Sequence, residues 1–258
     1  MSGEVMLASA VVIAVIMFVT WMLSVALKNA SIVDIVWGLG FVAVAWTAFA
    51  VGNGDSTRGW VLAILATTWG LRLATHLAVR NVGHGEDYRY RAMRKHWGPR
   101  FPIISLVTVF LLQGVLMWIV SLSLQLGQVE RSPGFGPIGT MGISVWAFGL
   151  VFESVGDMQL RRFKADPANA GKVLCTGLWR FTRHPNYFGD AVVWWGISIV
   201  GAEAGVGVFG FIGAAVMTFL LVRVSGVSLL EKSLKKRKPE YEDYVRRTSA
   251  FIPRPPKA

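Results

Sequence analysis

The stretch Gly177–Asp190, with the sequence GLWRFTRHPNYFGD, places charged and hydrogen-bonding side chains directly before an apolar run. Pro185 favours the first turn of a helix, so Asn186 and Tyr187 are expected in the first turn of a helix that enters that run. Free N–H groups at this helix start attract an anion such as phosphate. The flanking cationic candidates are Lys172, Arg180, Arg183 and His184. The alternative is a polar interfacial loop with aromatic anchors.

A second polar group closes the preceding apolar segment. Glu153, Asp157, Arg161 and Lys164 follow one another at spacings of four, four and three, which places them on one helical face. They form either intrahelical ion pairs with basic side chains extended toward water or part of a binding site. The position of the two carboxylates in an apolar zone favours the site, because an unpartnered carboxylate is costly there.

The elements that must position these residues are membrane helices. The chain has 258 residues, is 53% apolar and carries its apolar residues in long blocks. We predict an all-α integral membrane protein with seven transmembrane helices in a single membrane domain. The expected spans are residues 5–27, 31–52, 59–79, 102–126, 138–160, 187–202 and 206–223. The last two are separated only by the weak break at 201–207.

The distribution of basic residues predicts the orientation. With the amino terminus outside and the carboxy terminus cytoplasmic, 23 of the 26 Lys and Arg fall in cytoplasmic segments. The net charge of +11 therefore needs no nucleic acid to explain it, and anionic lipids at the cytoplasmic face are the expected partners. We expect a multi-pass protein of a bacterial plasma membrane, and the sequence does not define its oligomeric state.

Other site classes are weakly supported. Residues 5–27 have an acidic start and no clear cleavage site, so they are interpreted as the first span and not as a signal peptide. Cys175 is the single cysteine, which excludes intrachain disulfides. His84, Glu86, Asp87 and His96 lie in a basic loop without convincing ligand spacing, so no metal site is predicted.

Several of these motifs together resemble the carboxy-terminal half of the steroid 5α-reductase superfamily. They are GLWRFTRHPNYFGD followed by VVWWG, Asp157 with Arg161, and the terminal elements Glu231, Tyr241–Tyr244 and Ile252–Pro253. Asp34–Gly38 also resembles a D-x-x-W-G element of the little-characterised bacterial branch. More distant relatives are the sterol C14 and Δ7 reductases and the isoprenylcysteine carboxyl methyltransferases.

The resemblance implies an NADPH site at the cytoplasmic ends of the last helices, within residues 138–258, with NADH as an option. The implied cofactor-binding residues are Asp157, Arg161, Lys164, Lys172, Asn186 and Asp190, with Tyr187, Glu231 and Tyr244 nearby. Arg183 and His184 are further candidates, because they flank the helix start that is expected to attract a phosphate. Lys164 and Lys172 stand where the steroid enzymes have arginine, and lysine binds phosphate without the bidentate fork.

Residues 1–126 are expected to form the lipid-substrate side. Steroid 5α-reductases are thought to polarise the substrate carbonyl with a Glu and a Tyr from early helices, but none of the five tyrosines lies in the first three predicted spans. Arg72 is expected to pair with Asp34, as a structural ion pair or as part of the site. The catalytic candidates are Asp34, Arg72 and His76, and the candidates for an apolar substrate slot are Trp37 and Trp69.

The resulting prediction is an NADPH-dependent membrane reductase that saturates an activated C=C bond of a lipid such as a steroid or isoprenoid. An S-adenosylmethionine-dependent lipid or prenylcysteine-type methyltransferase is the alternative, because RHPNYFGD also resembles that branch. A third option is a non-catalytic lipid-binding protein. It predicts that Asn186→Ala and Asp190→Ala leave cellular function intact.

Overall fold

The computed structural model describes residues 1–224 and 241–257. Within these residues the fold is helical without a β-strand, and one isolated parallel bridge joins Thr182 to Ser249. The chain divides into two compact units. The first contains residues 1–140 and 197–213, and the second contains residues 141–196 and 214–258.

The first unit is built from the amino-terminal helices. Its main α-helices are α1 (Ser2–Ala26), α2 (Ile32–Val51), α3 (Ser56–Asn81), α4 (Tyr88–Trp97), α5 (Phe101–Ser105), α6 (Leu112–Val120) and α7 (Leu122–Leu126). Three shorter turns complete it: the 3₁₀ turn η1 (Gly98–Arg100), the π-helix η2 (Leu106–Leu111) and the 3₁₀ turn η5 (Gly205–Gly210). Helix α8 (Pro137–Ala165) begins in this unit and continues into the second.

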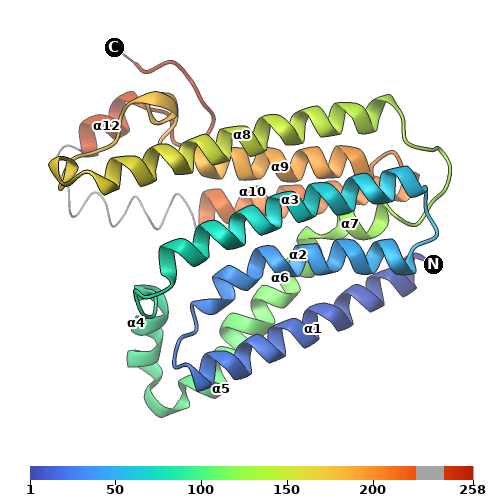
Figure 1. Cartoon of the computed structure of the whole chain (residues 1–258), viewed down its shortest axis with the longest axis horizontal. Coiled ribbons are helices and arrows are strands. Elements are labelled where there is room, and N and C mark those ends of the chain that lie inside the picture. Colours follow the sequence, from blue (N-terminus) through green and yellow to red (C-terminus); the bar gives the residue numbers. More distant parts are fainter. Residues whose placement is uncertain (225–240, 258) are drawn as a thin grey trace. The chain divides into compact units, whose positions relative to one another are not determined.

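Most of the other described helices belong to the second unit. Helix α9 (Pro185–Gly201) begins at the predicted proline, and α10 (Phe211–Phe219) is followed by the π-helix η6 (Leu220–Val224). Residues 197–201 of α9 and 211–213 of α10 belong to the first unit. Two 3₁₀ turns, η3 (Pro167–Asn169) and η4 (Gly177–Arg180), lie between α8 and α9, and α12 (Tyr241–Arg247) precedes the carboxy-terminal segment. Figure 1 shows the order of these helices along the chain.

Among the residues that the structure describes, six helices are long and apolar enough to cross a membrane, which indicates a multi-pass membrane protein. They are Ser2–Ala26, Ile32–Val51, Ser56–Asn81, Tyr88–Val120, Pro137–Ala165 and Gly205–Val224. The predicted span at residues 187–202, which would be the additional seventh, corresponds to α9, whose 17 residues cover only about 26 Å at the α-helical rise. The seventh span and the orientation of the termini remain predictions. So does the division into 1–126 and 138–258, although residues 197–213 pack with the amino-terminal helices.

The fourth span differs from the expectation at both ends. Residues 88–100 were expected to be a loop, but the helical run begins at Tyr88. Asp87 causes this early start, because its carboxylate caps the helix by accepting a hydrogen bond from the Arg89 N–H at 2.9 Å. The run ends at Val120, and residues 122–126 form the separate helix α7.

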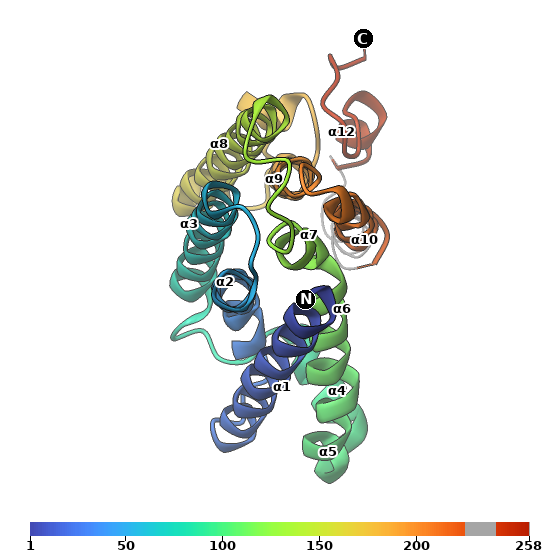
Figure 2. The same ribbon diagram turned by 90° about the vertical axis from the view of Figure 1, so that its right-hand side faces the viewer.

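Helices α2 and α3 lie side by side in both views (Figures 1 and 2), and glycines allow their close approach. A Cβ at Gly38 would lie 2.5 Å from the Gly70 carbonyl oxygen, and a Cβ at Gly70 would lie 2.5 Å from the Gly38 oxygen. Next to this contact Phe41 meets Trp69 edge to face, with 5.7 Å between ring centroids. Small residues that bring backbones together are typical of helix packing in membranes.

The segment after α7 is fixed by Arg58, which is completely buried. Its guanidinium donates hydrogen bonds to the carbonyl oxygens of Gly127 and Pro133, both at 2.7 Å, and to that of Glu130. A buried charge needs such partners because desolvation is costly. Arg58 is one of the three basic residues outside the predicted cytoplasmic segments, and its contacts with these carbonyls give it a structural role.

In the second unit α8 and α9 cross with their backbones in contact. A Cβ at Gly189 would lie 2.4 Å from the Glu153 backbone nitrogen, and one at Gly196 would lie 2.5 Å from that of Trp146. On α8, a Cβ at Gly149 would lie 2.6 Å from the Val193 nitrogen. The crossing therefore requires glycine, and it brings the polar residues of both helices together.

Candidate functional site

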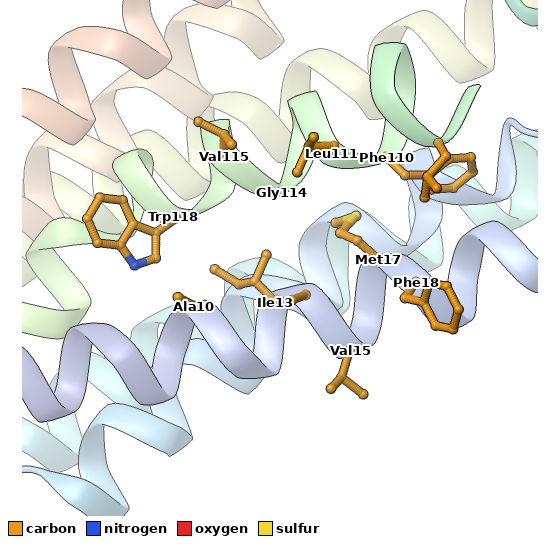
Figure 3. A pocket seen from close by; sticks show the side chains of 12 residues that line it. Ala10, Ile13, Val15, Met17, Phe18, Phe110, Leu111, Gly114, Val115 and Trp118 are labelled. Carbon is orange, nitrogen blue, oxygen red and sulfur yellow. The ribbon is translucent and has the colours of Figure 1, made fainter. Parts of the chain in front are cut away.

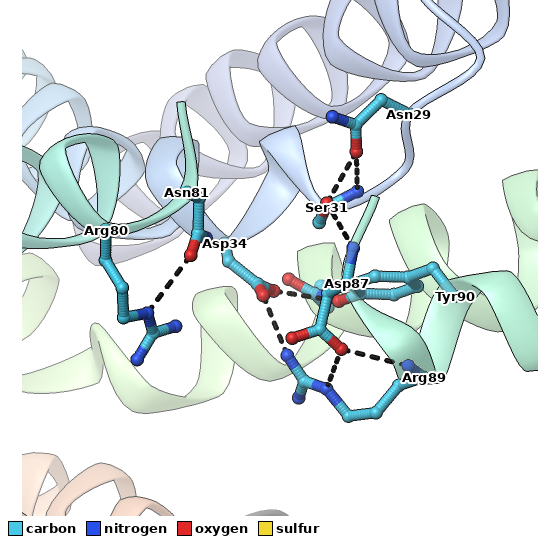
Figure 4. A network of polar contacts seen from close by, with 9 residues as sticks. Asn29, Ser31, Asp34, Arg80, Asn81, Asp87, Arg89 and Tyr90 are labelled. Carbon is cyan, nitrogen blue, oxygen red and sulfur yellow. Dashed lines mark hydrogen bonds and ion pairs between the residues drawn. The ribbon is translucent and has the colours of Figure 1, made fainter. Parts of the chain in front are cut away.

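The first unit contains a partly buried polar network around Asp34, in the first turn of α2 (Figure 4). The Asp34 carboxylate accepts a hydrogen bond from the Tyr90 hydroxyl at 2.8 Å and another from Arg89 Nη2 at 2.8 Å. Gln113 Nε2 lies 3.4 Å from the Tyr90 oxygen, to which it donates. The Tyr90 side chain is buried, with 6% of its surface exposed. The network thus joins four side chains from α2, α4 and α6, with the carboxylate of Asp34 and the phenol of Tyr90 at its centre.

A second set of contacts holds α4 in this position. Arg89 Nε donates to Asp87 Oδ1 at 2.9 Å, and the Asp87 N–H donates to the Ser31 hydroxyl at 3.1 Å. Glu86 accepts the N–H of Ala30 at 2.8 Å and binds Arg94 through both carboxylate oxygens, at 2.8 and 2.9 Å. The turn between α1 and α2 is therefore joined to the segment that precedes α4.

The two carboxylates of this segment are stabilised in their charged form. Burial raises the pKa of Glu86, but the hydrogen bonds from Arg94 and from the Ala30 N–H outweigh it and leave the pKa below its ordinary value. Burial likewise opposes ionisation of Asp87, and the hydrogen bonds from Arg89 bring the pKa of Asp87 below its ordinary value. Both groups therefore stay charged at neutral pH and keep α4 attached.

The structure corrects the predicted partner of Asp34. Arg72 was expected to pair with it, but the cation that binds Asp34 is Arg89. The reason is the early start of α4, which carries Arg89 and Tyr90 back against the first turn of α2. The same fold supplies a tyrosine that the sequence could not place, because no tyrosine lies in the first three predicted spans. Among sequence signals, Asp87 as a helix cap two residues before Arg89 could have identified this helix.

This arrangement can polarise a carbonyl group. A buried phenol beside a carboxylate and an amide donor can turn its O–H toward a ligand oxygen while Arg89 balances the Asp34 charge. In the same unit, the two tryptophans predicted to line an apolar substrate slot pack against Phe41. Trp69 is completely buried against Phe41, and Trp37 packs edge to face on Phe41 at 5.2 Å. Their role in substrate binding, and the catalytic roles of Arg72 and His76, remain predictions.

The second unit contains the other candidate residues at the α8–α9 crossing. Asn186 Nδ2 donates a hydrogen bond to Asp157 Oδ1 at 3.0 Å. Glu153 lies one turn before Asp157, and Asp190 lies one turn after Asn186. Glu153 and Asp157 are buried, with 3% and 7% of their surfaces exposed. The structure therefore joins two of the motif residues, Asp157 and Asn186, that the sequence analysis placed on different helices.

The segment before α9 is held by the carboxy-terminal helix. Trp179 donates from its indole to the Gly156 carbonyl at 3.1 Å, and the Tyr244 hydroxyl donates to the Trp179 carbonyl. Gly177 has a φ of +60°, a conformation that favours glycine, and its α-carbon faces the Gln159 amide. Tyr244, a predicted cofactor residue, thus has a direct role in positioning the motif.

Arg183 and His184 are both buried, and Arg183 binds backbone carbonyls. Its guanidinium donates to Val245 O at 3.1 Å and to Thr248 O, where α12 ends. A cation at this end of a helix satisfies carbonyls that lack partners and interacts favourably with the helix dipole. His184 stacks on Tyr187, with parallel rings 5.5 Å apart. The packing accounts for Arg183 as a clamp on α12, and its predicted contact with a phosphate remains a prediction.

The other predicted cations are accessible. Arg161 and Lys164 are exposed at the end of α8, and Lys172 is exposed in the following segment. Glu231 lies outside the residues that the structure describes. Within the described part of the chain, no group of three or more His, Cys, Asp or Glu side chains could hold a metal ion.

Comparison with known proteins places this chain in a family. Residues 20–248 match the family described as "Protein of unknown function (DUF1295)". The uncharacterized protein C594.04c of Schizosaccharomyces pombe is 26% identical in an alignment that covers 92% of this chain and 76% of the yeast protein. No solved structure matches the chain.

Proposed function

The chain belongs to the DUF1295 family, which is part of the steroid 5α-reductase-like superfamily, and from this premise we propose that it is an NADPH-dependent lipid reductase. Its substrate class is a membrane lipid with a C=C bond conjugated to a carbonyl. The observation that carries the proposal is the buried Tyr90 hydroxyl held between Asp34 and Gln113. The predicted bacterial branch is part of the proposal; the yeast relative shows that similar chains also occur in a eukaryote.

The residues of the first unit account for activation of the carbonyl. Addition of hydride to the β carbon moves an electron pair onto the carbonyl oxygen, so the transition state carries negative charge there. Tyr90 stabilises this charge by donating its hydrogen bond to that oxygen, and the Gln113 amide supports the phenol oxygen. Arg89 balances the negative charge of Asp34 when the Tyr90 hydroxyl turns away from that carboxylate. A proton from water then completes the reduction at the α carbon.

The residues of the second unit fit a dinucleotide. Asp157, Asn186 and Asp190 offer acceptors and an amide for ribose hydroxyls and a carboxamide, and exposed Arg161, Lys164 and Lys172 offer charge for phosphates. Bound there, reduced nicotinamide would supply the hydride. Because these cations are mostly lysines, NADH is the second candidate cofactor.

An S-adenosylmethionine-dependent methyltransferase is the second candidate function. The observation that favours it is the acidic character of the α8–α9 crossing, where Glu153 and Asp157 are buried and Arg183 is engaged with carbonyls of α12. Carboxylates suit a sulfonium and an ammonium group. A dinucleotide needs the exposed cations instead, so the two ligands depend on different residues.

Ligand binding and turnover by the purified full-length protein test both candidates. We expect NADPH to raise the unfolding temperature, and Lys164→Gln with Lys172→Gln to weaken that effect. We also expect NADPH to be consumed with a lipid enone and not with its saturated analogue. Stabilisation by S-adenosylmethionine alone, with methyl transfer to a lipid, would establish the second candidate. Binding of neither cofactor would leave the non-catalytic lipid-binding protein.

A further inference from the structure

An open groove of about 780 Å³ lies in the first unit between α1 and the helical run from η2 to α6 (Figure 3). Its walls come from α1 between Ala10 and Phe18 and from residues 106–118. Gly114 makes room there, because a Cβ at this position would already contact Ile13 and Met17 at 3.4 Å. All of the lining residues are apolar or glycine.

Two tryptophans hold the walls of the groove together at its ends. Trp21 on α1 donates from its indole to the Pro102 carbonyl at 2.8 Å, and Trp118 on α6 donates to the Met6 carbonyl at 3.1 Å. The Trp118 ring lines the groove with its N–H already engaged. An occupant therefore meets hydrocarbon only, and since both walls belong to membrane-spanning helices, the surrounding medium is acyl chains.

A stripe of exposed side chains leads from a cation into this groove. Arg100, Ile103, Val107, Leu111 and Val115 follow one another at spacings of three, four, four and four. The four apolar members are 74%, 57%, 57% and 49% exposed, and the last two line the groove. Residues 100–115 cover about 22 Å at the α-helical rise, which is about the depth of one leaflet with its headgroups.

The cationic end of the stripe lies on an exposed basic surface, defined as Arg91, Lys95 and Arg100. Their side chains form no ion pair with any residue in 1–224 or 241–257, whereas Arg89 and Arg94 are paired with carboxylates. Trp97, which is 40% exposed, stands beside them. Cations and an indole at the end of a span are typical of contact with lipid headgroups.

We infer that one anionic diacyl phospholipid binds along this run, with its phosphate on the basic surface and one acyl chain in the groove. The charge of the basic surface selects the anionic headgroup, and the length and apolar lining of the groove select the chain. This inference does not rest on the proposed function, because it uses no residue of the reductase site.

Native mass spectrometry of the full-length protein tests the inference with dioleoyl phosphatidylglycerol and dioleoyl phosphatidylcholine as probes. We expect one phosphatidylglycerol to bind more tightly than phosphatidylcholine. Arg100→Gln should weaken phosphatidylglycerol alone, about fivefold for one basic residue near an anionic headgroup. Ala14→Phe should fill the groove and weaken both lipids, since Ala14 is an exposed residue of its wall.

Two matched variants control for general effects. Arg254→Gln removes an exposed cation elsewhere, and Val11→Phe adds a ring on the exposed face of α1 outside the groove. Both should bind as the wild type does. Equal binding of the two lipids, or equal losses in the controls, would overturn the inference. A dimer that Ala14→Phe dissociates, with no bound lipid, would show that a second copy covers the groove instead.

Discussion

Two regions of this chain keep carboxylates in apolar surroundings, and they do so by different means. Asp34 in the first unit is compensated by Arg89 and Tyr90, side chains that lie 55 and 56 residues away in the sequence. Asp157 in the second unit is held by Asn186 at a crossing where glycines bring two backbones together. A cation and a phenol bind the carboxylate in the first unit, and an amide on the neighbouring helix binds the carboxylate in the second.

This difference decides how each region should respond to mutation. At the α8–α9 crossing the contacts are between backbones, so added volume is the damaging change. At the Asp34 network the contacts are between side chains, so loss of charge or of a hydrogen bond is the damaging change. The network can also rearrange around a ligand oxygen, which a backbone contact cannot do.

The largest effect on stability is expected from Gly189→Ala. Its Cβ would lie 2.4 to 2.7 Å from three atoms of Glu153, so α8 and α9 must separate. We expect a loss of about 3 kcal/mol, measured as a lower unfolding temperature in detergent. Gly3→Ala is the matched control, because nothing lies within 4 Å of a Cβ there. Equal unfolding temperatures for the two variants would show that the crossing is not tightly packed.

The next effect is expected from Asp34→Asn, which leaves Arg89 with Asp87 as its remaining carboxylate. We expect a loss of about 2 kcal/mol, in line with hydrogen bonds to charged groups. Combining it with Arg89→Gln should cost clearly less than the sum of the two single changes, because both remove one interaction. Strict additivity in a double-mutant cycle would contradict the pairing.

A smaller, local effect is expected from Arg183→Gln. The change removes the donors to the Val245 and Thr248 carbonyls, at a cost of about 1 kcal/mol. Hydrogen exchange should become faster in residues 241–247 and stay unchanged in α1. Exposed Arg180 provides the control as Arg180→Gln. Unchanged exchange in α12 would show that Arg183 does not clamp it.

The smallest effect is expected from pH. Glu86 and Asp87 have lowered pKa values in the folded protein. Their contribution to stability is therefore complete above their unfolded pKa values, near 4, and is lost as pH falls through the folded values. Between about pH 6 and about pH 3 the unfolding temperature should fall less in the double variant Glu86→Gln, Asp87→Asn than in the wild type. An identical fall in the two proteins would show that Glu86 and Asp87 do not contribute to the loss of stability at low pH.

The sequence predicts features that depend on local chemistry. Pro185 defines the start of α9 because proline suits the first turn of a helix, and the apolar blocks lie in the six described helices that are long and apolar enough to cross a membrane. The residues around Asn186 could be proposed as a site because they form one continuous motif. The role of Arg183 was harder to predict, since its partners are the backbone carbonyls of Val245 and Thr248, which lie 62 and 65 residues further along the chain.

The Asp34 network could not be predicted because its partners come together only in the folded chain. Arg89 and Tyr90 belong to a segment that resembles a basic loop, and hydropathy gives it no helical signal. Its helix depends on the Asp87 cap, and its position depends on the contacts of Glu86 with Ala30 and of Asp87 with Ser31. Such contacts between distant segments leave no spacing pattern in the sequence.

The central claim is that Tyr90 polarises the substrate carbonyl, and Tyr90→Phe tests it most directly. The measurement is the rate of NADPH oxidation with a lipid enone, alongside NADPH affinity, for the wild type, Tyr90→Phe and Tyr88→Phe, a control at an exposed tyrosine. We predict that Tyr90→Phe lowers the rate about 100-fold or more while NADPH affinity is unchanged, and that Tyr88→Phe matches the wild type. A Tyr90→Phe protein that reduces the enone at the wild-type rate would contradict the account.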